Sequence, residues 1–322
     1  MRDVARAADV SVKTVSRVFN GDPNVTPETR ARVEHAMKEL NYVPNTLAST
    51  FRSGHSHVIG ISVPDIVDPF FASIARSCDE VSRKHGLSTL VTSVGDDPRG
   101  QREAVESLLA RRLAGLVMVP IGNDHSWLER WQSNTPIVFV DREAQNLEAT
   151  SFTDDNFAGA QLGTAHLIDH GHKPIAYFGD DLSLSTEVQR QAGYRAAIEE
   201  SGCEFDDRLV IGNVSSRQAA ADALEQLEQQ SSRPAAIFSS NARTTMCLVP
   251  VLKKFGLPLV GFGDFPLADV VNPSVTVVAQ NPSQLGALAA EHIFESLARD
   301  KMTRPNSRVL TVALTERDSC TI

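Results

Sequence analysis

The chain has 322 residues, of which 42% are hydrophobic and 22% are charged, and its formal net charge at pH 7 is −9. Such a composition is that of a globular protein with two or three domains, and no apolar run approaches the roughly 20 residues that a membrane span needs. Asp3, Arg6 and Lys13 interrupt the start, which excludes the apolar core of a secretion signal. We therefore expect a cytoplasmic protein with no membrane partner.

The charge is distributed unevenly along the chain. Residues 1–55 hold eight Lys/Arg and six Asp/Glu, whereas the remainder holds 23 Lys/Arg and 34 Asp/Glu. A mildly basic head on an acidic body suits a protein that touches DNA with one small part.

Residues 3–8 predict a short first helix that ends in a tight turn. Asp3 is placed to cap its N-terminus, and Asp9 is one of the few residue types besides glycine that tolerate a left-handed turn. The apolar side of this helix is expected to consist of Val4, Ala5 and Ala8.

A second helix is expected over residues 11–20. Ser11 can cap it and Asn20-Gly21 stops it, and its apolar positions recur at helical spacing: Val15, Val18 and Phe19. The remaining face is short or cationic and carries Val12, Lys13, Thr14, Ser16 and Arg17. Such a face can enter a DNA major groove and reach base edges and phosphates. A plain helical hairpin within a larger domain is the alternative.

A third helix and a linker follow. Thr26 as N-cap and Pro27 at the first helical position predict a strong helix start. The apolar stripe is Val33, Ala36, Met37 and Leu40. We assign residues 1–44 to a small helical headpiece. Residues 45–56 predict a short helix and linker with little to pack against, which can become ordered on DNA or beside a second copy.

From residue 57 the pattern changes to alternating strands and helices. Apolar, β-branched runs occur at 58–63, 88–93, 116–119 and 137–140, and again at 175–178, 209–211, 235–238 and 259–262. Such runs indicate parallel sheets covered on both faces. The chain is therefore expected to be an α/β protein in which an all-α headpiece precedes two doubly wound subdomains. Their bounds are about 57–154 with 281–308, and about 155–280 with 309–322.

Binding sites in such sheets lie beyond the carboxyl ends of the strands. The candidates there are Asp68, Phe70, Phe71, Asp141, Arg142, Arg190, Asn241, Asp264 and Gln280. Carboxylate, amide and guanidinium groups can bond the hydroxyls of a polyhydroxylated ligand, while an aromatic side chain covers the apolar face of its ring. We expect one of the two phenylalanines on the ligand and the other in the core. A structural ion pair under a loop is the alternative for Asp141-Arg142.

No motif indicates catalysis or a bound cofactor. The chain has no G-x-S-x-G elbow, and no phosphate loop or G-x-G-x-x-G follows a strand. Free thiols are expected at the scattered cysteines, Cys78, Cys203, Cys247 and Cys320. The spacing of His166, His170 and His172 suggests a metal triad, but the first two belong to a helix that ends at Gly171. We expect a structural role without a metal.

These features together resemble the lactose-repressor/galactose-repressor (LacI/GalR) family of bacterial transcription regulators. The resemblance covers nearly the whole chain, and the body is similar to the periplasmic binding proteins, those for ribose in particular. It rests on two motifs in the head: Asp3-Val4-Ala5 with Val10-Ser11-Val12-Lys13-Thr14-Val15-Ser16-Arg17-Val18-Phe19-Asn20, and Leu40-Asn41-Tyr42-Val43-Pro44-Asn45.

The resemblance implies a helix-turn-helix head with a recognition helix at residues 11–20 and a hinge helix at 45–52. It implies DNA contacts by Val12, Lys13, Thr14, Ser16, Arg17, Asn20, Asn45, Ala48 and Phe51. The implied partners are a palindromic double-stranded operator and a second copy in a homodimer. Phe51 stands where the family usually inserts a leucine into the minor groove, and Asp9 replaces the family's turn glycine.

In the body, the resemblance implies a small-molecule effector. Asp68-Pro69-Phe70-Phe71 resembles the Asn-Pro-Phe-Phe of ribose-binding proteins, and Asp141-Arg142 resembles their Asp-Arg. Two positions depart from the family: the usual Asn-Asp pair reads Asn241-Ala242, and the usual ligand aspartate is Gly263. Either Asp264 takes over that role or the pocket recognises a differently decorated molecule.

We therefore predict a transcription regulator, with repression as the expected mode, whose operator affinity is switched by a pentose or a ribose-containing nucleoside. Two alternatives belong to other classes of protein. A sugar-binding receptor without a DNA role would need an export signal and no DNA-binding head. A sugar-modifying enzyme on the same fold would need a general acid or a nucleophile in the cleft.

Overall fold

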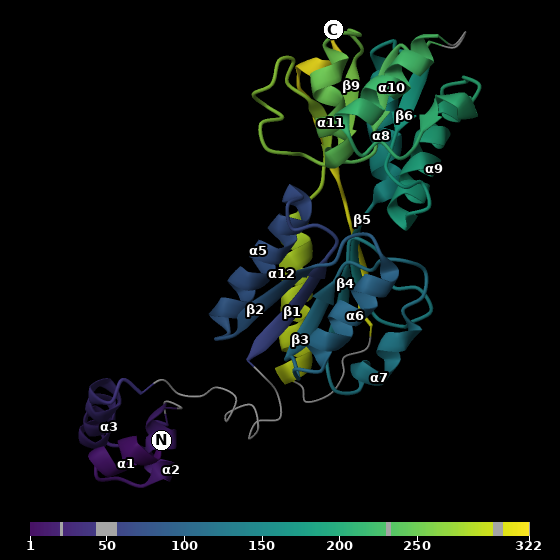
Figure 1. Ribbon diagram of the computed structural model, residues 1–322. Coiled ribbons are helices and arrows are strands. Elements are labelled where there is room, and N and C mark those ends of the chain that lie inside the picture. Colours follow the sequence, from purple (N-terminus) through teal and green to yellow (C-terminus); the bar gives the residue numbers. More distant parts are fainter. Residues whose placement is uncertain (20–21, 43–56, 230–232, 299–304, 322) are drawn as a thin grey trace. The chain divides into compact units, whose positions relative to one another are not determined.

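The computed structural model describes residues 1–19, 22–42, 57–229, 233–298 and 305–321 (Figure 1). The chain divides into two compact units, Met1–Ser56 and His57–Ile322. In the described ranges, none of the helices is both long enough and apolar enough to span a bilayer. All four cysteines are free; Cys78 and Cys320 are buried, whereas Cys203 and Cys247 are half-buried.

The described residues of the first unit form three helices, α1 (Arg2–Ala7), α2 (Val12–Phe19) and α3 (Pro27–Glu39). The turn before α2 passes through Asp9, whose φ of 49° lies in the left-handed region that was predicted for it. Ser11 Oγ accepts the N–H of Thr14 at 3.0 Å, which confirms the predicted cap of α2. The centre of this unit is a small core of Val4, Ala5, Ala8, Val15, Val18, Val33 and Ala36.

The predicted start of α3 is confirmed as well. Thr26 is its N-cap and accepts the N–H of Thr29 at 3.4 Å, and Pro27 occupies the first helical position. Proline fits there because its missing N–H would have no partner within the helix.

Three details predicted for the head are wrong. α1 begins at Arg2, so Asp3 lies inside the first turn and makes no cap hydrogen bond; its carboxylate there still favours the positive end of the helix dipole. Phe19 and Leu40 are 43% and 46% exposed rather than part of the core. Phe19 is the last residue of α2 and Leu40 follows the last residue of α3, so each lies at the edge of the small core. Asn20, Asn45, Ala48, Phe51 and the predicted hinge helix lie outside the described residues.

The second unit contains two six-stranded sheets (Figure 1). The first has the order β11-β5-β4-β3-β1-β2, and all its strands are parallel. Its strands are β1 (Val58–Val63), β2 (Ser88–Ser93), β3 (Gly115–Met118), β4 (Ile137–Val140), β5 (Thr150–Asp154) and β11 (Arg308–Leu310). Helices α5 (Pro69–Lys84) and α12 (Pro282–Ala298) cover one face. On the other face lies α6 (Pro98–Leu109), followed in the chain by the short α7 (Glu129–Gln132).

The second sheet has the order β12-β10-β9-β8-β6-β7, in which β12 alone is antiparallel to its neighbour. Its strands are β6 (Ile175–Phe178), β7 (Val210–Ile211), β8 (Ala236–Ser239), β9 (Leu259–Phe262), β10 (Thr276–Ala279) and β12 (Ala313–Thr315). Helices α8 (Asn156–Asp169) and α9 (Ser185–Glu200) cover one face. Helices α10 (Arg217–Glu228) and α11 (Ala242–Leu252) cover the other. The predicted fold class, two parallel-sheet subdomains behind a helical head, is confirmed.

The chain crosses between the two sheets after β5, after β10 and between β11 and β12. The last crossing falls after Leu310 rather than after residue 308, because β11 pairs with β5 through Leu310. These crossings join the two subdomains. Residues that follow the carboxyl ends of strands in both sheets can therefore line a space between the subdomains.

Candidate functional site

One cleft is lined by residues of both sheets. Its open space is about 700 Å³, including the mouth. One wall comes from the segments after β1, β2 and β4, and the other from α9 and from the segments after β8, β9 and β10. All nine residues that were predicted to bind a ligand line it: Asp68, Phe70, Phe71, Asp141, Arg142, Arg190, Asn241, Asp264 and Gln280.

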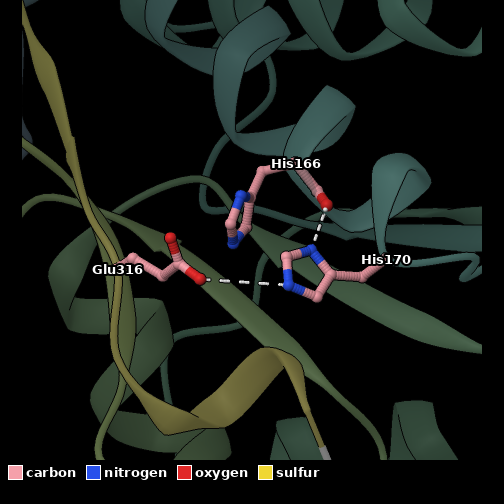
Figure 2. A group of neighbouring side chains, drawn as sticks. All are labelled: His166, His170 and Glu316. Atoms are coloured by element: carbon pink, nitrogen blue, oxygen red, sulfur yellow. Dashed lines mark hydrogen bonds and ion pairs between the residues drawn. The ribbon is translucent and has the colours of Figure 1, made fainter.

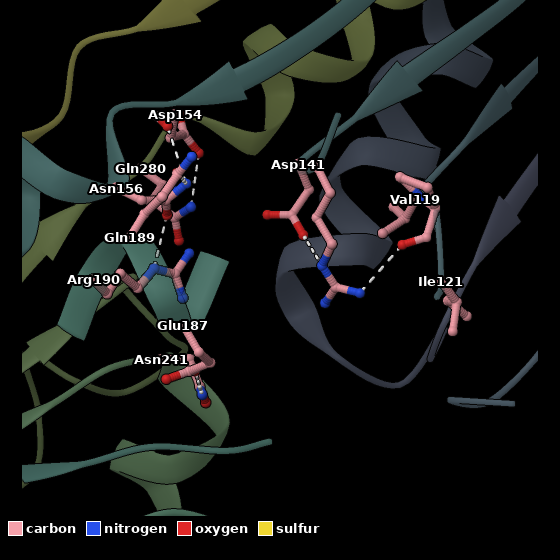
Figure 3. Close-up of polar contacts among 12 residues, drawn as sticks. Val119, Ile121, Asp141, Asp154, Asn156, Glu187, Gln189, Arg190, Asn241 and Gln280 are labelled. Atoms are coloured by element: carbon pink, nitrogen blue, oxygen red, sulfur yellow. Dashed lines mark hydrogen bonds and ion pairs between the residues drawn. The ribbon is translucent and has the colours of Figure 1, made fainter. Parts of the chain in front are cut away.

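Asp141 and Arg142 form a buried pair at the end of β4. The backbone turns sharply there, because Asp141 has a φ of 69°. Asp141 Oδ2 lies 3.3 Å from Arg142 Nε, and Arg142 Nη1 donates to the carbonyl oxygen of Pro120 at 3.4 Å (Figure 3). The structural ion pair that was the alternative is therefore present, and the same two residues line the cleft.

The N-terminus of α5 brings a carboxylate and an aromatic ring to the same wall. Asp68 Oδ1 accepts the N–H of Phe70 at 2.9 Å, which caps the helix. Burial raises the pKa of the Asp68 carboxyl above its usual range. Phe71 is 9% exposed and packs in the core of the first sheet, whereas Phe70 is half-buried at the cleft. The two rings meet edge to face at 5.3 Å.

Arg190, on α9, is the most firmly held cation of the opposite wall. Its Nε donates to Asn156 Oδ1 and its Nη1 to the carbonyl oxygen of Ser240, both at 2.8 Å (Figure 3). The guanidinium lies 4.1 Å from the ring centroid of Phe262, a cation–π contact that also covers its rear face. Nη2 has no hydrogen bond within the part of the chain that the structure describes. A positioned N–H donor is therefore left for a ligand.

Glu187 is a buried carboxylate that the sequence analysis missed. It accepts hydrogen bonds from the hydroxyls of Tyr177 and Ser240 at 2.7 and 2.8 Å, and from Asn241 Nδ2 at 3.0 Å. Asn241 in turn caps α11 through the N–H of Thr244. One signal was available, since residues three apart on a helix share a face and Glu187 precedes Arg190 by that spacing.

Asp154 and Gln280 lie where the chain crosses between the sheets. Gln280 Nε2 donates to Asp154 Oδ2 at 2.7 Å (Figure 3). Asp154 Oδ1 is buried and has no hydrogen bond to any described residue. Burial raises the pKa of Asp154 to about 6, although the hydrogen bond from Gln280 works in the opposite direction. Asp154 was not predicted as a site residue, because β5, the strand that ends at Asp154, was not predicted from the sequence.

The departure from the family pattern at Gly263 leaves the cleft without a side chain there. Gly263 has a φ of 85°, which a side chain would strain. The neighbouring Asp264 is bound to Arg317 by hydrogen bonds of 3.1 and 2.7 Å. Its carboxylate is therefore committed to an ion pair at the edge of the cleft.

The walls of the cleft are rich in carboxylates. Seven acidic side chains line it: Asp65, Asp68, Asp96, Asp141, Asp180, Glu187 and Asp264. Only three arginines do so, and two of them are paired with lining carboxylates, Arg142 with Asp141 and Arg243 with Asp180. The cleft is therefore negative overall, with many hydrogen-bond acceptors and few free cations.

The predicted DNA-reading face lies on α2. Val15 and Val18 point into the core of the head, so the opposite face of α2 turns outward. Val12, Lys13 and Arg17 are exposed, and Thr14 and Ser16 are half-buried. Arg17 is 55% exposed and forms an ion pair of 3.4 Å with Asp22. A pair so open to solvent is weak, so its guanidinium can exchange this partner for a nucleic acid.

The two parts match two family models. Residues 56–315 match the model described as periplasmic binding proteins and sugar binding domain of the LacI family, and residues 1–45 match that of bacterial regulatory proteins, lacI family.

Individual relatives match most or nearly all of the chain. The ribose operon repressor of Escherichia coli (strain K12) is 29% identical over 99% of each chain. The HTH-type transcriptional regulator DegA of Bacillus subtilis (strain 168) is 30% identical over 88% of this chain and 87% of its own. Among solved structures, the lac repressor dimer bound to operator and the anti-inducer ONPF is 26% identical. It covers 99% of this chain and 98% of its own, with a TM-score of 0.87.

Proposed function

This chain belongs to the LacI family of bacterial regulatory proteins, and from that premise we propose that it is a repressor whose operator affinity is set by an uncharged polyhydroxylated effector in the cleft. It is a DNA-binding transcription regulator, as its relatives are, and not an enzyme. One observation above all supports the proposal: nine residues chosen from the sequence for ligand chemistry line a single cleft.

The charge of the cleft supports a neutral effector. Sugar hydroxyls donate hydrogen bonds, and carboxylates are strong acceptors. A phosphorylated sugar would instead bring its charge against seven carboxylates with few free cations to compensate. We propose a pentose or a ribose-containing nucleoside. The ribose operon repressors among the relatives support this class.

On the DNA side, we propose that Val12, Lys13, Thr14, Ser16 and Arg17 read the major groove. From the resemblance alone we add Asn20, Asn45, Ala48 and Phe51, which lie outside the described residues. A homodimer on a palindromic operator is supported by the similar lac repressor dimer, and a cytoplasmic location follows from the access to DNA that this function requires.

The switch requires an effector that favours one arrangement of the two walls. A ligand bonded both to Asp68 and Arg142 on one wall and to Arg190 on the other stabilises the closed cleft. Linkage then demands that operator affinity differ between the open and closed states.

Binding of DNA from the chain's own upstream region tests the head directly. In fluorescence anisotropy, Arg17→Ala should weaken specific binding by about tenfold to a hundredfold, because a bidentate base contact contributes about 1–3 kcal/mol. The control is Arg76→Ala, which removes an exposed cation from the second unit. If Arg17→Ala binds that DNA as tightly as the control does, the assignment of the recognition helix is wrong.

A thermal-shift screen of pentoses, ribonucleosides and ribose 5-phosphate tests the cleft, since a ligand that binds only the folded protein raises its melting temperature. We expect stabilisation by an uncharged member and none by ribose 5-phosphate. A larger shift with the phosphate than with ribose would refute the argument from charge.

A further inference from the structure

Three side chains with metal-binding atoms converge outside the cleft, at the C-terminal end of α8. They are His166, His170 and Glu316, here called the His-His-Glu cluster (Figure 2). Their ligand atoms all lie within 4.8 Å of one another. His166 lies in the last turn of α8, His170 is the C-cap of that helix, and Glu316 directly follows β12. The cluster therefore joins a helix to the edge strand of the second sheet.

A hydrogen bond fixes which nitrogen of His170 can bind a metal. Its Nδ1 lies 2.9 Å from the carbonyl oxygen of His166 (Figure 2). A carbonyl oxygen only accepts, so Nδ1 carries the proton, and in the neutral ring Nε2 presents its lone pair. That Nε2 is the atom 4.0 Å from Glu316 Oε1. Metal-binding histidines are commonly oriented in this way, by a bond from the second ring nitrogen to a backbone carbonyl.

His166 adds a second nitrogen that lacks a partner. Its Nε2 is buried and makes no hydrogen bond with any described residue. Figure 2 shows its ring turned toward the space between His170 and Glu316. A buried ring nitrogen without a partner is costly, and a cation in that space would remove the cost.

The third histidine of the sequence motif does not belong to this cluster. His172 Nε2 lies 2.8 Å from the carbonyl oxygen of Cys320, so its role is structural, as expected. Glu316 takes its place, because the antiparallel pairing of β12 with β10 brings the C-terminal segment close to α8. Sequence spacing within one helix could not reveal this carboxylate.

We propose that the His-His-Glu cluster is a binding site for a divalent transition-metal ion, with zinc as the preferred occupant. Imidazole nitrogens and a carboxylate oxygen are ligands that zinc accepts in tetrahedral sites. Zinc bonds of about 2.0–2.2 Å place the ligand atoms roughly 3.5 Å apart. Glu316 can close the remaining distance, because its side chain is 63% exposed. Water fills the fourth position.

The bound ion would connect a short edge strand to a helix. β12 has only three residues and lies at the edge of its sheet. A metal that bridges Glu316 to α8 therefore ties the C-terminal strand to the helix that packs on β9 and β10. Because the ion binds the folded state only, it should raise the melting temperature by about 5 °C at a hundredfold excess over its dissociation constant.

The test uses the full chain without an affinity tag, freed of metal by a chelator. Calorimetric titration with zinc should show one ion per chain, and zinc should raise the melting temperature reversibly, with reversal by chelator. Cobalt as a second probe should give the visible absorption of a tetrahedral site. Both His170→Ala and Glu316→Gln should lose the zinc-dependent shift. Glu316→Gln should also keep the metal-free melting temperature, because the Glu316 side chain is 63% exposed.

The matched control is His35→Ala, which removes an exposed histidine of the head and should leave zinc binding unchanged. Two results would overturn the proposal. One is the absence of stoichiometric zinc binding by the metal-free protein. The other is zinc binding that survives in both His170→Ala and Glu316→Gln, which would assign the ion to other residues.

Discussion

Asp154 carries a carboxyl group that the fold holds in an unfavourable place. Burial raises its pKa from 3.8 to about 6, so the folded state binds this proton more tightly than the unfolded state does. Between these two values the folded protein carries more protons, and its stability falls as the pH rises. The destabilisation is complete above about pH 6 and absent below about pH 4.

Replacing this carboxyl by an amide should therefore stabilise the protein at high pH alone. We expect Asp154→Asn to raise the free energy of unfolding at pH 8 by about 3 kcal/mol, with the gain disappearing near pH 4. The amide oxygen can still accept from Gln280. Urea titrations at both pH values measure this, with the exposed Asp269→Asn as control. A gain that is equal at pH 4 and pH 8 would contradict the explanation.

Arg190 is the residue on which effector binding should depend most. Its Nε and Nη1 are held by Asn156 and Ser240, so Nη2 is positioned before the ligand arrives. Arg190→Lys keeps the charge and loses the fork of donors. The variant should lose the thermal shift caused by the effector. Arg195→Ala, which changes an exposed arginine of the same helix, should keep it, and equal shifts in both variants would place the ligand elsewhere.

At the scale of residues, the sequence predicted which side chains line the cleft but not the hydrogen bonds that hold them in place. Positions such as Asp141 and Asn241 follow buried strands, and parallel topology brings the ends of strands together. Glu187 and Asp154 acquire their roles from partners distant in the chain, Ser240 and Gln280. From the sequence alone, a glutamate within a polar helix is expected to be exposed to solvent.

At the scale of elements, the site depends on the close approach of α8 and α9. Asn156 begins α8 and Arg190 lies on α9, so their hydrogen bond requires the two helices to touch. Gly193 permits this: a Cβ there would overlap the carbonyl oxygen of Phe157 and lie 3.0 Å from the backbone nitrogen of Gln161. Backbone atoms of a packed helix cannot yield as the end of a side chain can.

Gly193→Ala should therefore destabilise the protein although alanine favours helices. Helix propensity offers about 1 kcal/mol in its favour, whereas overpacking costs about 1–3 kcal/mol and here requires the helices to separate. We expect a net loss of about 2 kcal/mol, measured by urea denaturation, and weaker effector binding as Arg190 shifts. Arg195→Ala on the outer face of α9 is the control. A Gly193→Ala protein that is as stable as the control would show that the helices are not in close contact.

Strands were predictable where apolar residues run on without interruption, as in β1, β4 and β9. β5 was not predicted because its sequence, Thr150–Asp154, is mostly polar although every residue is buried. Its Thr150 is hydrogen-bonded to His292 and to the N–H of Asn306, partners that no local pattern reveals. β11 and β12 escaped because three residues are too few to show a period.

At the scale of the whole molecule, the proposed switch depends on how the two sheets of the second unit are joined. Two sheets share three crossings and enclose one cleft between their strand ends. A polyhydroxylated ligand that donates hydrogen bonds to carboxylates of both walls stabilises the closed cleft. The free energy by which the ligand favours the closed state limits how far it can change the affinity for DNA.

Operator affinity measured as a function of effector concentration tests this account most directly. The probe is a labelled fragment of the chain's own upstream region, titrated with protein in fluorescence anisotropy. The effector is the uncharged sugar or nucleoside that gives the largest thermal shift. The account predicts that saturating effector changes the dissociation constant of the wild-type protein for this DNA by about tenfold or more, and that the Arg190→Lys protein binds the same DNA without responding. An effector that stabilises the protein yet leaves its operator affinity unchanged would contradict it.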